Sequence, residues 1–551
     1  MSEQSNLKAG EEAALLARVR AAARQEQFLE VVTAETARAR FAAALDLSPL
    51  SSVVVPLAQS LHRVLARDVV AEVDAPPFDR SNVDGFAIRA ADTAGVTETT
   101  PKQLTLNGEV IACGHGPTLE VAPGTATAIA TGGVIPRGAD AVVMLEQTEL
   151  VEEDQPAIEL RRAVAPGQFI SYAGSDIARG ETLLRRGTPI GSREIGMLAA
   201  CGLAEVEVVR RPKVAVLSTG DELVQPGEPL KPGGVYDSNG AILTAAIDEA
   251  GGEAVHVGAF PDDEPALEKA VRAALQVCDM VVLSGGTSKG AGDLSHTIVS
   301  RLGKPGILVH GVALKPGKPL CLAVAQGKPI VVLPGFPTSA IFTFHAFAAP
   351  VIRARAGLPP EAAQTVTAHV PVRVASEMGR KEFLLVSLVE SDKGALAFPT
   401  GKGSGSVTSF SQADGFIEID QLASALDAGC TAQVTLIGRA ARAPDLVIMG
   451  SHDVALDMVV NALAARGFSA RTLAVGSLGG VAAATRGQCD VAPVHLIDPL
   501  TGKYNAHLAS PELTLVPGWQ RLQGILYRPG DKRFEGKEVK EALAAVLADP
   551  N

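Results

Sequence analysis

The stretch KVAVLSTGDEL, residues 213–223, decides the fold of this chain. Its first half is an apolar run of the length of a buried strand, and its second half is a turn rich in hydroxyl groups, glycine and acid. In an open parallel sheet, ligands bind outside the carboxyl ends of the strands. A glycine-rich turn at that end exposes backbone N–H groups that bind phosphate. We therefore predict a strand that ends in an anion-binding loop.

Three further loops have the same character: SGGTSKG at 284–290, KPGKP at 315–319 and PGFPTS at 334–339. Apolar runs of strand length accompany them at Met280–Ser284 and Ile330–Leu333, with a weaker run at Leu320–Ala325. Strands that alternate with helices indicate βαβ units and a mostly parallel sheet. The helical patterns lie at about 239–250, 264–277, 292–302 and 338–354. Four such loops in one α/β region predict a single polyanion site.

Changes of pattern divide the rest of the chain, and at about 150 residues per domain a chain of this length holds three or four domains. We expect a multidomain α/β and β protein. Its expected parts are a mixed helical/β N-terminal domain at 1–70 and 166–211, an inserted small β domain at 71–165, a mostly parallel α/β domain at 212–356, a small C-terminal β domain at 357–440, and an incomplete α/β lobe at 445–551.

Periodicity predicts several individual elements outside the α/β region. Apolar residues recur at helical spacing over 11–46 and again over Glu194–Leu203. In the last segment we expect strands at Leu446–Met449, Ala470–Val475 and Asp490–Leu496, with a second lobe beginning at Val516–Arg528.

Composition restricts the class of protein. The net charge of −12 argues against a nucleic-acid binder, which would carry a basic face. No run approaches the ~18–20 apolar residues of a membrane span, and the N-terminus is unlike a signal peptide. The six cysteines are widely separated, which favours reduced thiols in the cytosol. We expect a cytoplasmic protein without membrane contact.

Charged residues near the loops suggest the chemistry of the site. Lys315 and Lys318 flank a Pro-Gly turn and can face one anion. Asp262 and Asp293 fall in loops at the same end of the predicted sheet, where carboxylates with substrate phosphates can hold Mg²⁺. Asp221 and Asp237 lie on neighbouring loops, and each can instead cap a helix. Asp84 lies in a Pro-rich loop, where simple turn chemistry is the alternative to a site role.

Six motifs, in this order, resemble those of molybdopterin molybdenumtransferase, the MoeA/gephyrin E-domain family. They are Pro76–Phe86, Thr131–Pro136 with Ala139–Val143, Ser218–Leu223, Ser284–Gly290, Lys315–Pro319 and Pro334–Ser339. The resemblance runs from about residue 28 to 440. It implies insertion of molybdate into adenylylated molybdopterin, release of AMP and a requirement for Mg²⁺.

The resemblance also implies a homodimer whose site lies between the α/β and C-terminal β domains of one subunit and the inserted β domain of the other. Other proteins of molybdenum cofactor biosynthesis are the expected partners. Two alternatives from other classes stay open: a pterin- or oxyanion-binding scaffold or sensor without catalysis, and a pterin adenylyltransferase that shares the α/β fold. Intact Asp293, Lys315, Lys318 and Arg380 favour the transferase.

Position by position, the resemblance assigns roles to individual residues. Asp262 and Asp293 match metal-linked acids, Lys315 and Lys318 match lysines near the phosphates and oxyanion, and Arg380 matches an arginine on the molybdate side. Ser404 matches the serine beside it, with Ser406 as the alternative. Asp84 matches a functional position outside the α/β domain. The residues expected to bind the pterin substrate are Ser218, Thr219, Gly220, Asp221, Ser284, Gly285, Gly286, Ser288, Pro334, Gly335, Ser339, Thr131 and Glu194.

Two parts of the chain depart from this family. Phe336 stands where members commonly carry asparagine, so we expect a side-chain amide contact to be absent. Residues 445–551 lie outside the family core and resemble one lobe of a periplasmic-binding-protein-like domain. Ser451 and Ser477 follow strands and open helices there, so they are candidate ligand contacts, with ordinary helix capping as the alternative.

Overall fold

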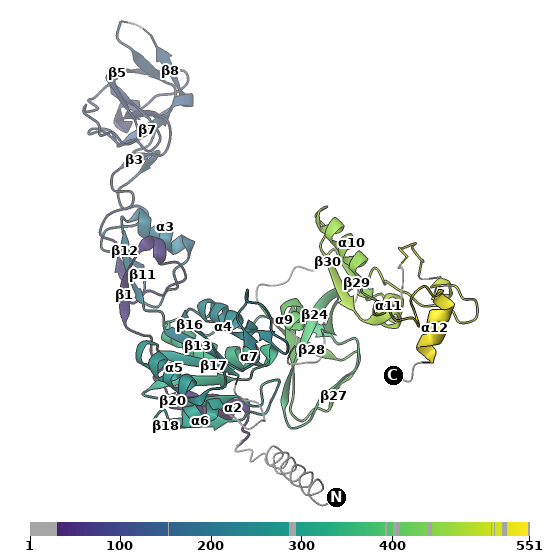
Figure 1. Ribbon diagram of the computed structural model, residues 1–551. Coiled ribbons are helices and arrows are strands. Elements are labelled where there is room, and N and C mark those ends of the chain that lie inside the picture. Colours follow the sequence, from purple (N-terminus) through teal and green to yellow (C-terminus); the bar gives the residue numbers. More distant parts are fainter. Residues whose placement is uncertain are drawn as a thin grey trace, which may run out of the picture.

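The computed structural model describes residues 30–548, apart from 153, 286–293, 392–393, 401–404, 406, 438–443, 509, 512 and 521–525, and apart from the side chains of 408, 409 and 412. Figure 1 shows an extended molecule in which a β module at one end is joined through a narrow neck to a central α/β unit, followed by a β unit and an appended unit. None of the helices formed by the described residues has the length and apolar character needed to span a bilayer.

The central unit is built on a six-stranded sheet in the order β16-β13-β17-β21-β20-β18. The first four strands are parallel, and β20 runs antiparallel to both of its neighbours. The expectation of a mostly parallel sheet is therefore confirmed. Gln326 and Gly327 both have positive φ and form the two-residue hairpin that reverses the chain before β21. The strands are β13 (Lys213–Thr219), β16 (Glu253–Phe260), β17 (Met280–Gly285), β18 (Pro305–His310), β20 (Cys321–Ala325) and β21 (Lys328–Leu333).

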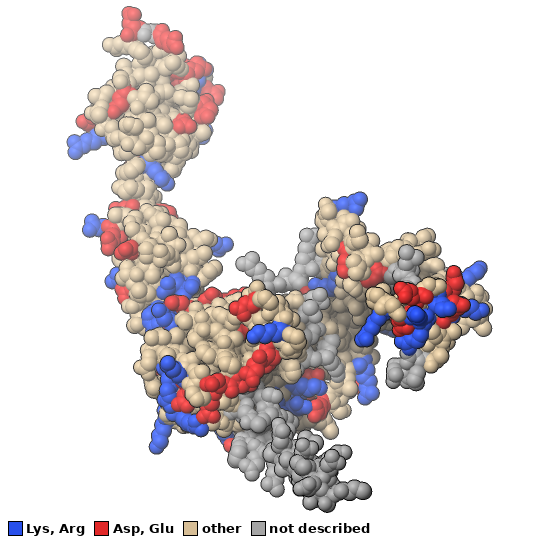
Figure 2. All heavy atoms as spheres, viewed as in Figure 1, with Lys and Arg blue, Asp and Glu red and all other residues tan. Residues whose placement is uncertain are grey.

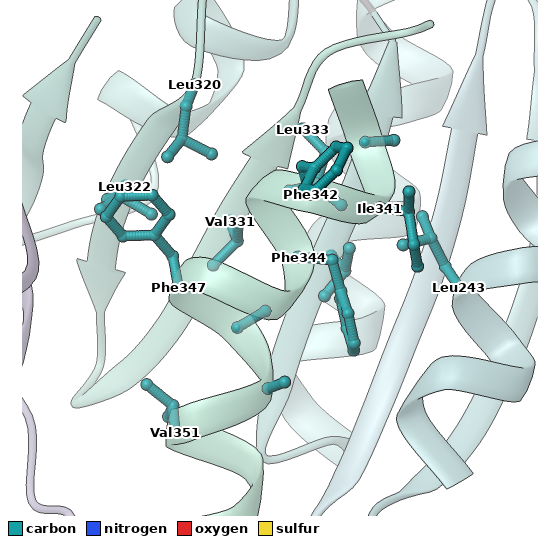
Figure 3. Close-up of a cluster of buried hydrophobic side chains, with 14 of the residues drawn as sticks. Leu243, Leu320, Leu322, Val331, Leu333, Ile341, Phe342, Phe344, Phe347 and Val351 are labelled. Atoms are coloured by element: carbon teal, nitrogen blue, oxygen red, sulfur yellow. The ribbon is translucent and has the colours of Figure 1, made fainter. Parts of the chain in front are cut away.

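Helices cover both faces of this sheet. One buried cluster joins the sheet to α2, α4, α7 and α8, and a second joins the opposite face to α5 and α6. Figure 3 shows part of the first cluster around Phe342, Phe344 and Phe347. The helices are α2 (Ala34–Ala43), α4 (Ser238–Glu249), α5 (Glu264–Val277), α6 (Leu294–Ser300), α7 (Pro337–Thr343) and α8 (Ala349–Arg355), with a π-helical turn at Phe344–Ala348.

The prediction of a helix through 11–46 is wrong for the residues just before Ala34, and residues 11–29 lie outside the described part of the chain. Val32 is in a bridge: its N–H donates to Gly311 O, and Ala313 N–H donates to Val32 O. Thr33 then caps α2 through its hydroxyl group. Extended backbone pairing therefore replaces the helix at the described residues before Ala34.

The segments on either side of the inserted module form a small unit with its own core around Leu65, Leu198 and Val208. The predicted helix over Glu194–Leu203 is confirmed as α3. Two antiparallel pairs hold the unit together. Its elements are β1 (Ser52–Pro56), the 3₁₀ turn Leu57–Gln59, β2 (Val69–Val70), β11 (Thr182–Leu184), α3 (Ser192–Ala200) and β12 (Glu205–Val209).

The inserted module is a six-stranded sheet in the order β7-β4-β6-β5-β9-β8. It is attached through one antiparallel pair, in which Ser81 lies opposite Ile170. Its elements are β3 (Arg80–Ser81), β4 (Gly85–Ile88), the 3₁₀ turn Ala90–Thr93, β5 (Lys102–Ile111), β6 (Thr125–Ile129), β7 (Ala141–Met144), the 3₁₀ turn Leu145–Gln147, β8 (Thr148–Val151), β9 (Ala157–Leu160) and β10 (Ile170–Ser171).

The β unit after α8 is a barrel, because β24 pairs with both β25 and β26. The two-residue strand β19 from the central unit adds to its edge, so Leu314 lies opposite Lys381. Its elements are β19 (Leu314–Lys315), β22 (Thr365–His369), β23 (Val374–Ala375), β24 (Lys381–Ser391), β25 (Gly394–Pro399), α9 (Val407–Gln412), β26 (Gly415–Ile419), β27 (Ala425–Leu426) and β28 (Thr431–Leu436).

In the appended unit, two parallel strands pack on helices. The predicted strand Asp490–Leu496 is wrong: only Val491 forms a bridge, to Ile448, because Pro493 cannot donate a ladder hydrogen bond. The described residues within 516–528 form neither strand nor helix. The elements are β29 (Leu446–Gly450), α10 (Val454–Ala464), β30 (Ala470–Ala474), α11 (Gly476–Thr485), the 3₁₀ turn Ala506–Leu508 and α12 (Val539–Leu547).

Charge is mixed over the molecule. On the face drawn in Figure 2, Lys and Arg side chains are interspersed with Asp and Glu, and the described residues form no continuous basic stripe. All six cysteines lie in the described residues and are free thiols, three of them buried.

Candidate active site

The carboxyl end of β13 places two hydroxyl groups and two carboxylates side by side. Thr219 Oγ1 donates to Asp262 Oδ1 at 2.8 Å, and the N–H of Asp262 donates to Asp221 Oδ1 at 3.0 Å. Ser218 is buried, and its Oγ has no hydrogen-bond partner among the described residues. The structure therefore brings together the first loop and the acid after β16, as the sequence predicted.

The second loop begins at the end of the neighbouring strand β17. Gly285 has φ +99°, and a Cβ there would lie 2.3 Å from the carbonyl oxygen of Thr219. Only glycine fits at this close approach of two loop backbones. Gly286, Ser288 and Asp293, which the sequence assigned to the site, lie outside the described residues.

Asn239, which the sequence reasoning missed, joins two of the loops. Its Nδ2 donates to Ser284 Oγ at 2.8 Å and to the carbonyl oxygen of Gly335 at 2.7 Å. Phe336 is 61% exposed. A side-chain amide of α4 thus contacts the backbone of the PGFPTS loop, beside the position where Phe336 itself offers no amide. The position of Asn239 as the second residue of α4, directly after the capping residue Asp237 and Ser238, was the available signal.

Asp237 caps α4, since its Oδ1 accepts the N–H of Gly240 at 2.9 Å. Its Oδ2 and the Oδ1 of Asn239 are buried without a hydrogen-bond partner among the described residues, like Ser218 Oγ. Native proteins seldom leave buried polar atoms unpaired. Three buried acceptors of this kind, at the end of β13 and the start of α4, match a site for a ligand that carries N–H or O–H donors.

The third loop leads from β19, which pairs with the barrel strand β24, back to β20 of the central sheet. Lys315 Nζ lies 3.2 Å from Glu382 Oε2, and Ser376 Oγ donates to the same oxygen at 2.7 Å. The side chain of Glu382 is 6% exposed. Lys318, three residues further on, forms no ion pair within the described part of the chain and is half-buried. One lysine is therefore fixed and the other is available to an anion.

The barrel contributes the remaining predicted groups. Arg380 pairs with Glu377, three residues before it. Ser404 and Ser406 lie outside the described residues, but Gly405 between them lies against the Phe336 ring, since a Cβ on Gly405 would be 3.5 Å from Phe336 Cδ1. The loop that carries the two candidate serines therefore meets the loop that opens α7.

Three predicted residues lie elsewhere in the same chain. Asp84 Oδ1 accepts the N–H of Thr131 at 2.7 Å in the inserted module. Glu194 accepts the N–H of Gly191 at 2.8 Å and caps α3; hydrogen bonds from its own N–H and from that of Gly191 lower the pKa of its carboxyl group. Figure 1 shows that the inserted module and the small unit with α3 lie at a distance from the central sheet. One chain alone does not bring these residues to the loops.

In the appended unit, the structure brings Ser451 and Ser477 together, with their Oγ atoms 2.8 Å apart. Neither is a helix cap, because Asp453 caps α10 and Val475 precedes α11. The capping interpretation is therefore wrong for both serines. No group of three or more His, Cys, Asp or Glu side chains suited to a metal ion occurs among the residues that the structure describes.

Known proteins share this architecture and sequence. The chain matches the families described as "MoeA N-terminal region (domain I and II)" over 32–202, "Probable molybdopterin binding domain" over 215–354 and "MoeA C-terminal region (domain IV)" over 367–437. It is 36% identical over 335 residues to "Molybdopterin molybdenumtransferase 2" of Mycobacterium tuberculosis (strain ATCC 25618 / H37Rv), covering 60% of this chain and 82% of that protein. The chain belongs to the MoeA family.

Further relatives agree with MoeA membership. "Molybdopterin molybdenumtransferase" of Bacillus subtilis (strain 168) is 35% identical over 387 residues, covering 70% of this chain and 89% of its own length. The solved structure of a molybdopterin biosynthesis MoeA protein from Pyrococcus horikosii matches with a TM-score of 0.64 and 39% identity, covering 74% of this chain and 99% of that one. Residues 460–543 lie outside the matched MoeA regions, and they match the family described as "PBP superfamily domain".

Proposed function

We propose that this protein is a molybdopterin molybdenumtransferase, a transferase that inserts molybdate into adenylylated molybdopterin and releases AMP. The observation that carries the proposal is the convergence of Ser218, Thr219, Asp262, Ser284 and Gly335 at the carboxyl ends of the central strands, where Asn239 ties the loops together. A site of hydroxyl groups, backbone N–H groups and lysines suits a phosphorylated ligand.

The pterin portion of the substrate carries several N–H donors. Ser218 Oγ, Asp237 Oδ2 and Asn239 Oδ1 are buried acceptors without partners among the described residues. Donors on the ligand would satisfy these acceptors, whereas bulk water has little access to them. The loop residues Gly220, Asp221, Gly286, Ser288, Pro334 and Ser339 are proposed to complete the pterin and phosphate site.

Lys315, Lys318, Arg380 and Ser404 are proposed to serve the anions. Molybdate is a tetrahedral dianion that arrives beside a phosphoanhydride, so negative charge accumulates. Lysine and arginine offset the repulsion and stabilise charge on the departing AMP phosphate. The planar guanidinium of Arg380 can present two parallel donors to the oxyanion. Glu382 pairs with Lys315, and Lys318 is therefore proposed as the lysine that binds the oxyanion directly.

Mg²⁺ fits the donor set around Asp262, which is an exposed carboxylate. Asp262 Oδ1 is fixed by Thr219, and Oδ2 has no partner within the described residues. Mg²⁺ usually takes one or two carboxylates together with phosphate oxygens and water. We propose that Asp262 and Asp293 hold the ion. Bound there, it would offset phosphate charge in the transferase reaction.

The protein is proposed to act in the cytoplasm as a homodimer, with other proteins of molybdenum cofactor biosynthesis as partners. Asp84, Thr131 and Glu194 lie in lobes apart from the central loops of their own chain. A second subunit that offers its inserted module to those loops would bring such residues to the site.

The test is direct assay. Purified protein is mixed with adenylylated molybdopterin, molybdate and Mg²⁺, and AMP and active cofactor are measured. Lys318→Met should lower the rate roughly ten- to a hundredfold, since a charge-assisted contact contributes about 1.5–3 kcal/mol. Lys231→Met, which removes an exposed lysine from the same unit, should leave it unchanged. Molybdate-independent AMP release, or equal rates for the two variants, would reject the assignment.

A further inference from the structure

The appended unit is fixed to the barrel by a buried ion pair. Arg471 of β30 uses both guanidinium nitrogens on Asp414: Nη2 lies 2.8 Å from Oδ1, and Nη1 contacts Oδ2. Nη1 also donates to the carbonyl oxygen of Leu388 at 2.7 Å. The side chains are 20% and 7% exposed. Apolar residues from both units also pack together in one cluster: Val389, Leu396 and Phe398 of the barrel with Val447, Met449 and Ala483 of the appended unit.

Asp414 depends on the appended unit for its neutralising charge. Among the described residues of the barrel, only the N–H of Leu388 donates to its carboxylate, at 2.7 Å. In the described part of the chain Arg471 is the one cation paired with it. A buried carboxylate that loses its cation is strongly destabilised. Loss of Arg471 would therefore destabilise the barrel segment around Asp414 in this conformation.

Asp414 in turn fixes the segment between α9 and β26. Its N–H donates to Val386 O at 3.0 Å, and its carbonyl oxygen accepts the N–H of Ile437 at 2.9 Å. Phe416, two residues later, meets the ring of Phe342 edge-on, with centroids 5.2 Å apart. These bonds leave little freedom for the backbone that carries Phe416.

The phenylalanine cluster continues to the candidate active site. Phe342 is stacked on Phe383 with centroids 5.0 Å apart, and Phe416 meets Phe383 edge-on at 5.4 Å. Phe342 belongs to α7, which the loop at 334–339 opens. Phe383 directly follows Glu382, the carboxylate that holds Lys315. Packed contacts therefore connect Arg471 to a lysine of the site and to the loop opposite it.

We propose that Arg471, in the appended unit, is a positioning residue for the anion end of the transferase site. By fixing Asp414 and the phenylalanine cluster, it sets the positions of Lys315 and the α7 loop. The appended unit is thereby part of the enzyme's working structure. The expected effect on molybdate use rests on the proposed function. The expected effect on the barrel structure, measured by hydrogen exchange, does not depend on it.

The expected kinetic effect is selective. Arg471 acts on the barrel side of the site, whereas Ser218 and Asn239 lie in the central unit. Arg471→Met should raise the molybdate half-saturation concentration about three- to tenfold, in the range of couplings carried by packed networks. The affinity for adenylylated molybdopterin should change little. Arg471→Lys, which keeps one contact with Asp414, should restore part of the loss.

The test compares the full-length Arg471→Met and Arg471→Lys proteins with Arg466→Met, which removes an exposed arginine of the same unit. Hydrogen exchange is measured over 380–386 and 410–420 together with molybdate titrations. Faster exchange in both segments for Arg471→Met alone, partly reversed by lysine, supports the proposal. Exchange identical to the wild type, or an unchanged molybdate half-saturation in an active enzyme, overturns it.

The two proposals fail in different ways. If the wild-type protein releases no AMP, the proposed function fails, and the exchange data alone decide whether Arg471 positions the barrel. If Arg471→Met does not fold, Arg471→Lys and its intermediate exchange rates carry the comparison.

Discussion

Lys315 and Glu382 lie opposite each other in paired strands, with Nζ 3.2 Å from Oε2, although they belong to different units of the chain. The strand pair places the buried carboxylate of Glu382 beside Lys315, a lysine of the candidate site. Ser376 holds the same carboxylate oxygen at 2.7 Å. The position of Lys315 is therefore determined by the barrel as much as by the loop that carries it.

Glu382→Gln should lower stability by about 1–3 kcal/mol, since the buried side chain at 382 loses its ion pair with Lys315 while the Ser376 contact can persist. AMP release should fall about tenfold as Lys315 loses its fixed position. Denaturant unfolding and the AMP assay measure the two effects. Glu418→Gln in neighbouring β26, whose carboxylate is half-exposed beside Lys381, should cost at most about 1 kcal/mol. Equal losses in the two variants would contradict the assignment.

Asn239→Asp should weaken binding of adenylylated molybdopterin about tenfold. The substitution removes the amide donor to Ser284 and Gly335 and leaves their acceptors unpaired, at about 1–3 kcal/mol. Equilibrium binding measures the effect. Asn107→Asp is the matched control, because Asn107 also donates to one hydroxyl and one carbonyl, in the inserted module. Asn107→Asp should lower stability without changing the affinity for adenylylated molybdopterin in the same binding measurement. An equal loss of affinity in both variants would count against the role of Asn239.

Gly285→Ala should destabilise the fold by about 2–5 kcal/mol, because left-handed backbone costs a side chain about 1–2 kcal/mol and overpacking adds about 1–3. A Cβ at Gly285 would meet Thr219 O at 2.3 Å, whereas at Gly258, with φ +123°, nothing lies within 4 Å. Gly258→Ala should therefore show the backbone cost alone. Thermal and urea unfolding of both variants give the comparison, and equal losses would remove the steric contribution.

Asp279 should give stability a dependence on acid pH. Burial raises the pKa of its carboxyl group, but Arg210 and the N–H of Lys213 favour the charged form more strongly, so the pKa lies below that of an ordinary aspartate. Because the unfolded chain binds the proton first, this contribution is present above pH 3.8 and is lost as the pH falls through the folded pKa.

Asp279→Asn should cost about 1–2 kcal/mol at pH 7, since the bidentate pair with Arg210 is partly exposed. Urea unfolding of the variant and the wild type at pH 7, 5, 4 and 3.5 tests both statements. The difference between the two proteins should stay constant down to about pH 5 and shrink progressively below it. A difference that grows on acidification would mean that the pKa is raised rather than lowered.

Subunit exchange tests the shared site. Asp84→Ala and Lys315→Ala proteins should each be inactive, and mixing them under conditions of exchange should restore part of the AMP release, because one of the two sites in a heterodimer is intact. Mixing two portions of Lys315→Ala protein is the control and should stay inactive. Persistent inactivity of demonstrated heterodimers would place the whole site within one subunit.

The sequence predicted the interior of the central sheet and missed its edges. β13, β17 and β21 are buried along nearly their whole length and appear as apolar runs. β16 was missed because it is an edge strand that carries Glu253 and His256 towards solvent. β18, at the other edge, begins at a proline. Edge strands pair on one side only, so their composition resembles that of loops. The domain boundaries expected from the sequence stay predictions.

The loops of the site were predicted from composition, but the contacts that fix them were not. Glu382 was overlooked within Arg380-Lys381-Glu382, although an acid at the start of the apolar run Phe383–Val386 is a usable sign of a buried pair. Its partner Lys315 is distant in sequence, so only the tertiary structure identifies the pair. The roles assigned to Asp293, Ser404 and the other matched residues likewise stay predictions.

The inserted module enters and leaves through one antiparallel pair, with Ser81 opposite Ile170. Its two ends are therefore a single strand spacing apart, about 5 Å. A tight turn can span that gap. Residues 82–169 can therefore be exchanged for the corresponding module of a relative without changing the path of the remaining chain. The activity of such chimaeras would separate the contribution of the module from that of the remaining chain. The exchange is possible because both ends of the module lie in one strand pair.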